Sequence, residues 1–173
     1  MDTTNSKFIP KSRENSKFSN WLGKEYTSNS INDTFQLAED LAPDLKPGDI
    51  LCLDGSLGAG KTHFVKGLAK ALGIDPKTVH SPTFTLIHEY LSGKIPLYHF
   101  DFYRLKNWQE ALDIGVEEYF WSDGISCIEW PDRITPILPS DALWLQIDSI
   151  TANTRKIFFR KGIRPGGEYM REG

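Results

Sequence analysis

Residues 55–62 constrain the fold of this chain more than any other segment. They are Gly55, Ser56, Leu57, Gly58, Ala59, Gly60, Lys61 and Thr62. This run matches G-x-x-x-x-G-K-[ST], the phosphate-binding loop (P-loop), in full. From average residue usage, the pattern should occur by chance in ~1% of chains of this length. Because the loop has to lie between a buried strand and a helix, it predicts a strand–loop–helix unit in an α/β domain.

The segments on either side of the motif agree with that prediction. Residues 50–53 form a short apolar run whose length suits a buried strand. Residues 61–72 have apolar side chains at helical spacing, and Gly73 provides a stop signal. The motif therefore has the local context that its chemistry requires.

Each position of the motif has a physical task. The glycines allow a tight turn in which successive N–H groups converge on phosphate oxygens. The helix that begins near Lys61 directs the positive end of its dipole at the same anion. Lys61 is expected to reach the β- and γ-phosphates, and the Thr62 hydroxyl to ligate Mg²⁺. The chain contains neither N-K-x-D nor D-x-x-G, which disfavours a GTPase.

The rest of the chain predicts further strands and helices around this unit. We expect an amphipathic helix over residues 31–45, a β-hairpin over 83–91 and 94–103, short helices over 107–113 and 116–121, a buried strand over 125–129, and antiparallel strands over 142–150 and 154–160. The predicted fold class is α/β: a P-loop NTPase-like three-layer sandwich. Its mixed sheet has a parallel centre with antiparallel strands and is flanked by helices.

The P-loop, the predicted elements and the composition of the two ends together predict three regions along the chain. Residues 1–25 are expected to form a loosely ordered leader, residues 26–161 the P-loop ATPase domain, and residues 162–173 a flexible tail. The start of the leader is rich in Ser, Asn, Thr and Lys and lacks the apolar segment of a secretory signal. No apolar stretch approaches the ~20 residues of a membrane-spanning helix, so no membrane association is expected.

Charge and cysteine content narrow the function classes. The chain has 20 Lys and Arg against 23 Asp and Glu, a net charge of −3. That balance excludes coating of nucleic acid by bulk charge, although action on nucleic acid through a partner stays open. Cys52 and Cys127 lie far apart in apolar runs, which favours reduced core cysteines over zinc or dithiol chemistry.

Two carboxylates end hydrophobic strands and are candidates for the remaining chemistry. Asp101 and Glu129 each follow an apolar run, and the carboxyl ends of sheet strands face the site where α/β proteins bind ligands. The hypothesis is that Asp101 holds Mg²⁺ through water and that Glu129 orients or activates the attacking water. For Trp130, next to Glu129, three roles stay open: covering the site, touching a partner, or packing.

Four motifs in order resemble the TsaE family. They are residues 55–62, Ser81-Pro82-Thr83-Phe84-Thr85-Leu86, His99-Phe100-Asp101-Phe102-Tyr103-Arg104-Leu105, and Ile128-Glu129-Trp130-Pro131. Family members are small ATPases required for threonylcarbamoyl modification of the adenosine next to the anticodon in ANN-decoding tRNAs. The resemblance covers about residues 30–160.

The resemblance implies a cytoplasmic protein with weak Mg-dependent ATPase activity when alone. Its cofactors would be ATP and Mg²⁺, and its partner the TsaB–TsaD heterodimer, whose TsaD subunit transfers the threonylcarbamoyl group. The tRNA would be reached only through that complex. ATP binding would support assembly, and hydrolysis would reset the complex between turnovers.

The family's site residues carry over to matching positions. The implied nucleotide contacts are residues 55–63, Thr83 in a switch-like loop, and Trp130; the catalytic residues are Lys61, Asp101 and Glu129; and the metal ligands are Thr62, Asp101 and Glu129. Two positions depart from the family. Ser56 stands where Asp is more frequent, which puts in doubt a charge at that loop position. His63 replaces a hydroxyl residue near the expected α-phosphate.

Two other functions fit the same loop. A small-molecule kinase can have this size, but it usually needs an Arg-bearing lid, and few basic residues lie between positions 73 and 129. A nucleotide-gated binding module would bind ATP without turnover. Low turnover is also expected of the ATPase, because the chain offers no clear arginine finger.

Overall fold

The structure is a computed structural model that describes residues 17–162. Seven strands of this region form one sheet: β1 (Glu25–Ser28), β2 (Ile50–Asp54), β3 (Ile87–Tyr90), β4 (Leu97–Asp101), β5 (Ile125–Glu129), β6 (Leu143–Ser149) and β7 (Arg155–Lys161). The α-helices are α1 (Ile31–Leu41), α2 (Lys61–Ala71), α3 (Trp108–Asp113) and α4 (Val116–Phe120). Short 3₁₀ segments cover Ala42–Asp44, Pro76–Thr78 and Pro131–Ile137.

The sheet has a parallel centre and antiparallel edges. Its strand order is β1-β7-β6-β2-β5-β4-β3. Strand β2 pairs in parallel with β5 and β6, and β5 pairs in parallel with β4. The pairs β1–β7, β6–β7 and β3–β4 are antiparallel. The prediction of a mixed sheet is therefore confirmed, and β2, which leads into the P-loop, lies at the middle of the order.

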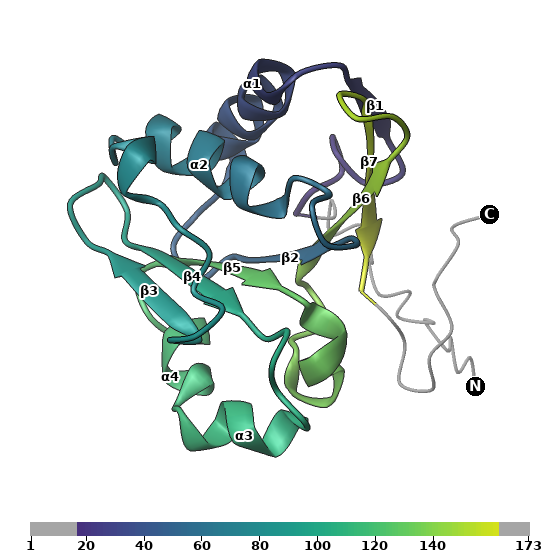
Figure 1. Ribbon diagram of the computed structural model, residues 1–173. Coiled ribbons are helices and arrows are strands. Elements are labelled where there is room, and N and C mark those ends of the chain that lie inside the picture. The colour runs from purple at the N-terminus through teal and green to yellow at the C-terminus, as the bar shows by residue number, and fades with distance from the viewer. Residues whose placement is uncertain (1–16, 163–173) are drawn as a thin grey trace, which may run out of the picture.

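Helices cover both faces of the sheet. Figure 1 shows α1 and α2 on one face and α3 and α4 on the other. Alternate residues of β2 pack into different apolar clusters: Leu51 and Leu53 join the cluster under α1 and α2, whereas Ile50 and Cys52 join the one that includes α3 and α4. This two-sided burial makes the predicted three-layer sandwich and explains why β2 is apolar without alternation.

The packed domain begins earlier than predicted. The prediction of a loosely ordered leader over residues 1–25 is wrong for residues 17–25, because Phe18 and Trp21 are buried in the core. The unpredicted strand β1 then pairs with β7, whose partner residues lie about 130 positions away along the chain. The rest of the leader, residues 1–16, and residues 163–173 of the expected tail lie outside the described residues.

Both cysteines are buried, as the sequence predicts. Cys52 and Cys127 are free thiols on the neighbouring strands β2 and β5. Burial raises the pKa of each thiol above its ordinary value, so both stay protonated. Within residues 17–162, no helix has both the length and the hydropathy to cross a bilayer.

A glycine lets α2 approach α1 closely. A Cβ added at Gly67 would lie 2.7 Å from the Phe35 Cα and 3.0 Å from the Ala38 Cβ. We expect Gly67→Ala to lower the free energy of unfolding by about 1–3 kcal/mol through overpacking, although alanine is intrinsically the better helix former by about 1 kcal/mol. Urea denaturation measures the change. An unchanged or higher stability would contradict this close-packing account.

Candidate functional site

The P-loop joins the end of β2 to the first turn of α2. Gly58 and Gly60 have φ angles of +75° and +104°, in the left-handed region that favours glycine. Gly60 is also the N-cap of α2, and no side chain caps the helix. The first N–H groups of α2 are therefore available to an anion at the positive end of the helix dipole.

Gly55 lies where the chain leaving β2 passes very close to β6, and this close approach requires a glycine. A Cβ at this position would lie 2.6 Å from the Ile147 carbonyl oxygen and 3.1 Å from the Ala59 Cβ. The first glycine of the motif therefore lets the loop leave β2 beside β6. The donors and glycines of this loop fit the phosphates of a nucleotide.

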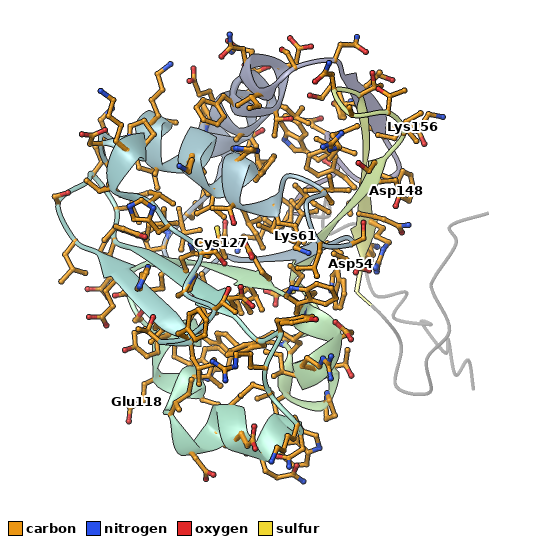
Figure 2. The ribbon with its side chains drawn as sticks, in the orientation of Figure 1. Asp54, Lys61, Glu118, Cys127, Asp148 and Lys156 are labelled. Atoms are coloured by element: carbon orange, nitrogen blue, oxygen red, sulfur yellow. The ribbon has the colours of Figure 1, made fainter. Side chains whose placement is uncertain are left out.

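The Lys61 side chain lies within the loop. It is 5% exposed, and its Nζ donates to the Gly55 carbonyl and to the Ser56 carbonyl at 3.2 Å. The same Nζ lies 4.0 Å from the centroid of the Trp130 ring. Burial lowers the pKa of Lys61, while nearby carboxylates, Glu129 first, act in the opposite direction. Figure 2 shows Lys61 where α2 begins, near the end of β2.

Glu129 contacts the predicted metal ligand. Its Oε1 accepts a hydrogen bond from the Thr62 Oγ1 at 2.7 Å and lies 3.2 Å from the His99 Nε2. His99 is fully buried on β4, and because a carboxylate only accepts, Nε2 is the nitrogen that donates in this contact. The Thr62 hydroxyl therefore meets Glu129, and no hydrogen bond joins it to Asp101 among the described residues.

Asp101 connects the site to the loop of residues 81–86, here called the 81–86 loop. Its Oδ2 lies 2.7 Å from the Ser81 Oγ and 2.9 Å from the Thr83 Oγ1, and its Oδ1 accepts from the Tyr103 N–H at 2.9 Å. The Ser81 Oγ is also 3.4 Å from the Glu129 Oε2. A change in the conformation of this loop would thus alter the hydrogen bonds of both Asp101 and Glu129.

The predicted hairpin is present as the antiparallel pair β3–β4, but the 81–86 loop shortens its first strand. A strand was expected from residue 83, but β3 begins at Ile87. The Leu86 N–H donates to the Pro82 carbonyl at 2.8 Å, and Leu86 has a φ of +68°, an unfavourable value for leucine. The hydroxyls of the loop bind Asp101 and so take part in the site, which strand periodicity does not reveal.

Trp130 also has a strained backbone. Its φ is +58°, and its ring centroid lies 4.9 Å from that of Tyr103. Together with the contact to Lys61, this places the indole at the wall of the cavity. Of the three roles left open for Trp130, this geometry supports covering the site, and it also supports packing, because Trp130 lies against the apolar cluster that includes α3 and α4.

These residues surround one cavity of about 390 Å³. Its lining consists of Leu57, Gly58, Ala59, Gly60, Lys61, Thr62, His63, Ser81, Thr83, Asp101, Tyr103, Glu129 and Trp130. Of the predicted site residues, only Gly55 and Ser56 do not line it. Ser81 and Tyr103 also line it and are not among the predicted site residues, although Ser81 stands in the Ser-Pro-Thr motif.

His63 also lines the cavity, at the start of α2. Burial lowers the pKa of its ring, and the positive charges of Lys66 and Arg155 act in the same direction. His63 therefore adds a mainly neutral imidazole at neutral pH.

A metal ion at this cavity would need ligands beyond those that residues 17–162 provide. In residues 17–162, no group of three or more His, Cys, Asp or Glu side chains is arranged to hold one. Thr62 and Glu129 offer oxygen ligands of the kind that Mg²⁺ prefers, with Asp101 close by. This donor set fits a Mg²⁺ ion that takes its other ligands from phosphates and water.

Comparisons with known proteins match most of the chain. The family model "Threonylcarbamoyl adenosine biosynthesis protein TsaE" matches residues 28–157. The tRNA threonylcarbamoyladenosine biosynthesis protein TsaE of Bacillus subtilis is 45% identical over 127 residues, which are 73% of this chain and 78% of that protein. The protein of the same name from Aquifex aeolicus is 42% identical over 142 residues, 81% of this chain and 98% of its own length.

A solved structure is also similar. The crystal structure of Bacillus subtilis YdiB superposes with a TM-score of 0.66 at 37% identity. The match covers 80% of this chain and 86% of that one. The fold described above is therefore one that an experimentally determined relative shares.

Proposed function

Because this chain belongs to the TsaE family of threonylcarbamoyladenosine biosynthesis, we propose that it is the ATP-binding and ATP-hydrolysing component of that machinery. In this proposal it acts in the cytoplasm with the TsaB–TsaD heterodimer on ANN-decoding tRNA. The observation that carries the proposal is the convergence of the P-loop, Lys61, Thr62, Asp101 and Glu129 on one cavity.

In the proposed mode of binding, main-chain N–H groups provide the main contacts to the phosphates of ATP. The N–H groups of the loop and of the first turn of α2 would donate to the phosphates, since Gly60 leaves that turn without a side-chain cap. Lys61 would exchange its two carbonyl partners for phosphate oxygens, which are stronger acceptors because they are charged. Thr62 and Glu129 would hold the Mg²⁺ that accompanies ATP, and this ion would help neutralise phosphate charge.

Hydrolysis is proposed to depend on the two carboxylates. Glu129 would orient the attacking water and accept its proton, while His99 and Thr62 keep the carboxylate in place. Asp101 would contact the Mg²⁺ ion through a water molecule. Because Asp101 also holds Ser81 and Thr83, the 81–86 loop is a candidate switch that responds to the nucleotide.

The proposed need for a partner rests on the charges at the site. No arginine is among the residues that line the cavity in the described region, so Lys61 is its one strongly basic side chain. An arginine finger can contribute several orders of magnitude to phosphoryl transfer. We therefore propose that turnover is slow alone and that TsaB–TsaD completes the site.

Phosphate release tests this function. With ATP and Mg²⁺, the full chain should release phosphate slowly without any acceptor, and adding TsaB–TsaD should raise the rate. A pull-down with TsaB–TsaD should also differ between ATP and ADP, because a switch requires differential affinity. ADP formed only when a metabolite is added would point to a kinase, and binding without turnover to a gated module; either result would contradict the proposal.

A further inference from the structure

Arg155 connects the β6–β7 hairpin to the outside of the P-loop. It is the first residue of β7, and its Nε donates to the Ala59 carbonyl at 2.8 Å. Its Nη2 donates to the Gly58 carbonyl at 3.2 Å. These contacts span 96 and 97 positions of sequence, and no motif in the chain identifies them.

The same guanidinium is held from the other side by its own hairpin. Nη1 lies within hydrogen-bond distance of the Thr151, Thr154 and Ala152 carbonyls, at 2.8, 3.1 and 3.3 Å. In the described part of the chain, no carboxylate forms an ion pair with Arg155. The hydrogen bonds that Arg155 makes within residues 17–162 thus all go to main-chain carbonyls, two of which belong to the P-loop.

Arg155 also fixes the direction of a P-loop N–H group, because the peptide bond between Ala59 and Gly60 is planar. In a trans peptide the C=O and the following N–H point in opposite directions, and the described chain has no cis peptide. The Ala59 carbonyl and the Gly60 N–H share one peptide plane. When Arg155 holds that carbonyl on the outside, the Gly60 N–H is directed away from Arg155.

The loop has few other means of fixing this plane. Gly58 and Gly60 are permissive residues, and the Ala59 N–H makes a local bond to the Ser56 carbonyl at 3.1 Å. Lys61 contacts the Gly55 and Ser56 carbonyls, in the first half of the loop. Arg155 is therefore the side chain that fixes the second half.

We propose that Arg155 is a positioning residue that preorganises the P-loop and so sets its affinity for nucleotide phosphates. The inference rests on the proposed function, because it assumes that the loop binds a nucleotide. Arg155 contacts the loop's carbonyls from outside, so its effect falls on binding and not on the chemical step. Since ATP and ADP share the α- and β-phosphates, both should depend on Arg155 equally.

Calorimetry with three variants tests the proposal. In Arg155→Ala, the Kd values for Mg–ATP and Mg–ADP should both rise about tenfold, as expected for lost hydrogen bonds to a charged group. The rate of hydrolysis at saturating ATP should stay within about twofold. Arg155→Lys keeps the charge but has one ammonium in place of a planar fork, so it should not restore full affinity.

The matched control is Lys156→Ala. Lys156 is the next residue of β7 and pairs with Glu25 of β1 at 3.3 Å, and Figure 2 shows it on the β6–β7 side of the molecule. This variant removes the same charge without touching the P-loop and should bind nucleotide like the wild type. If the wild type itself binds no nucleotide, the proposed function fails; if the wild type binds and Arg155→Ala binds equally well, only this inference fails.

Hydrogen exchange gives a readout that does not depend on nucleotide. In Arg155→Ala, or in Arg155→Lys should the alanine variant not fold, the amides of residues 57–60 should exchange faster than in wild type. Unchanged exchange there, or full affinity in Arg155→Lys, would overturn the proposal. So would a lowered melting temperature accompanied by an unchanged Kd, because it would show that Arg155 serves only the hairpin.

Discussion

Lys61→Met is expected to weaken Mg–ATP binding by at least about 100-fold and to abolish tRNA modification in a reconstituted system. The substitution removes the one ammonium that lies within the P-loop, and truncating such a charged contact typically costs several kcal/mol. Methionine keeps much of the length of the buried stem, so the packing against Trp130 is retained better than with alanine. Calorimetry and a modification assay with TsaB–TsaD measure the two effects.

The matched control is Lys70→Ala. Lys70 belongs to the last turn of the same helix, is exposed, and pairs with Glu39 at 2.9 Å. The Lys70→Ala variant removes an equal charge far from the loop, so Mg–ATP binding and tRNA modification should persist. Full modification activity in Lys61→Met would refute the requirement for ATP at this site.

Glu129→Gln is expected to slow ATP hydrolysis about 10²- to 10⁴-fold while Mg–ATP affinity changes less than about tenfold. The glutamine oxygen can still accept the Thr62 hydrogen bond, but the amide cannot take a proton from water. Single-turnover phosphate release, compared with calorimetric Kd, separates the two effects.

Glu118→Gln is the control for this variant. Glu118 is exposed on α4, and Figure 2 shows it well away from Lys61. It should hydrolyse ATP like the wild type. Normal hydrolysis in Glu129→Gln would remove Glu129 from the proposed mechanism. A loss of Mg–ATP affinity as large as the loss of hydrolysis rate would show that Glu129 acts only as a metal ligand.

The sequence predicts the part of the site that depends on local pattern. The P-loop is a continuous motif, and its strand and helix follow from apolar spacing on either side. Asp101 and Glu129 each end an apolar run, and β4 and β5 pair in parallel with these two residues in register. Their meeting at one edge of the sheet is therefore a consequence of chain direction, which the pattern contains.

What could not be predicted depends on contacts between distant segments. Strand β1 is short and mostly polar, and it forms only because it pairs with β7. The 81–86 loop is rich in residues that favour strands, yet its hydroxyls bind Asp101 instead of continuing a strand. Arg155 lies 96 positions from its nearest P-loop partner and belongs to no motif. In each case a tertiary hydrogen bond, and not local periodicity, decides the structure.

Every role proposed for the site depends on main-chain amides and one ammonium that bind the phosphates of ATP. Calorimetric titration of Mg–ATP into the full chain tests this binding most directly, with adenosine as the ligand that lacks phosphates. We expect saturable one-to-one binding of Mg–ATP and no measurable binding of adenosine at the same concentrations. No heat with Mg–ATP, or equal binding of adenosine, would contradict this expectation.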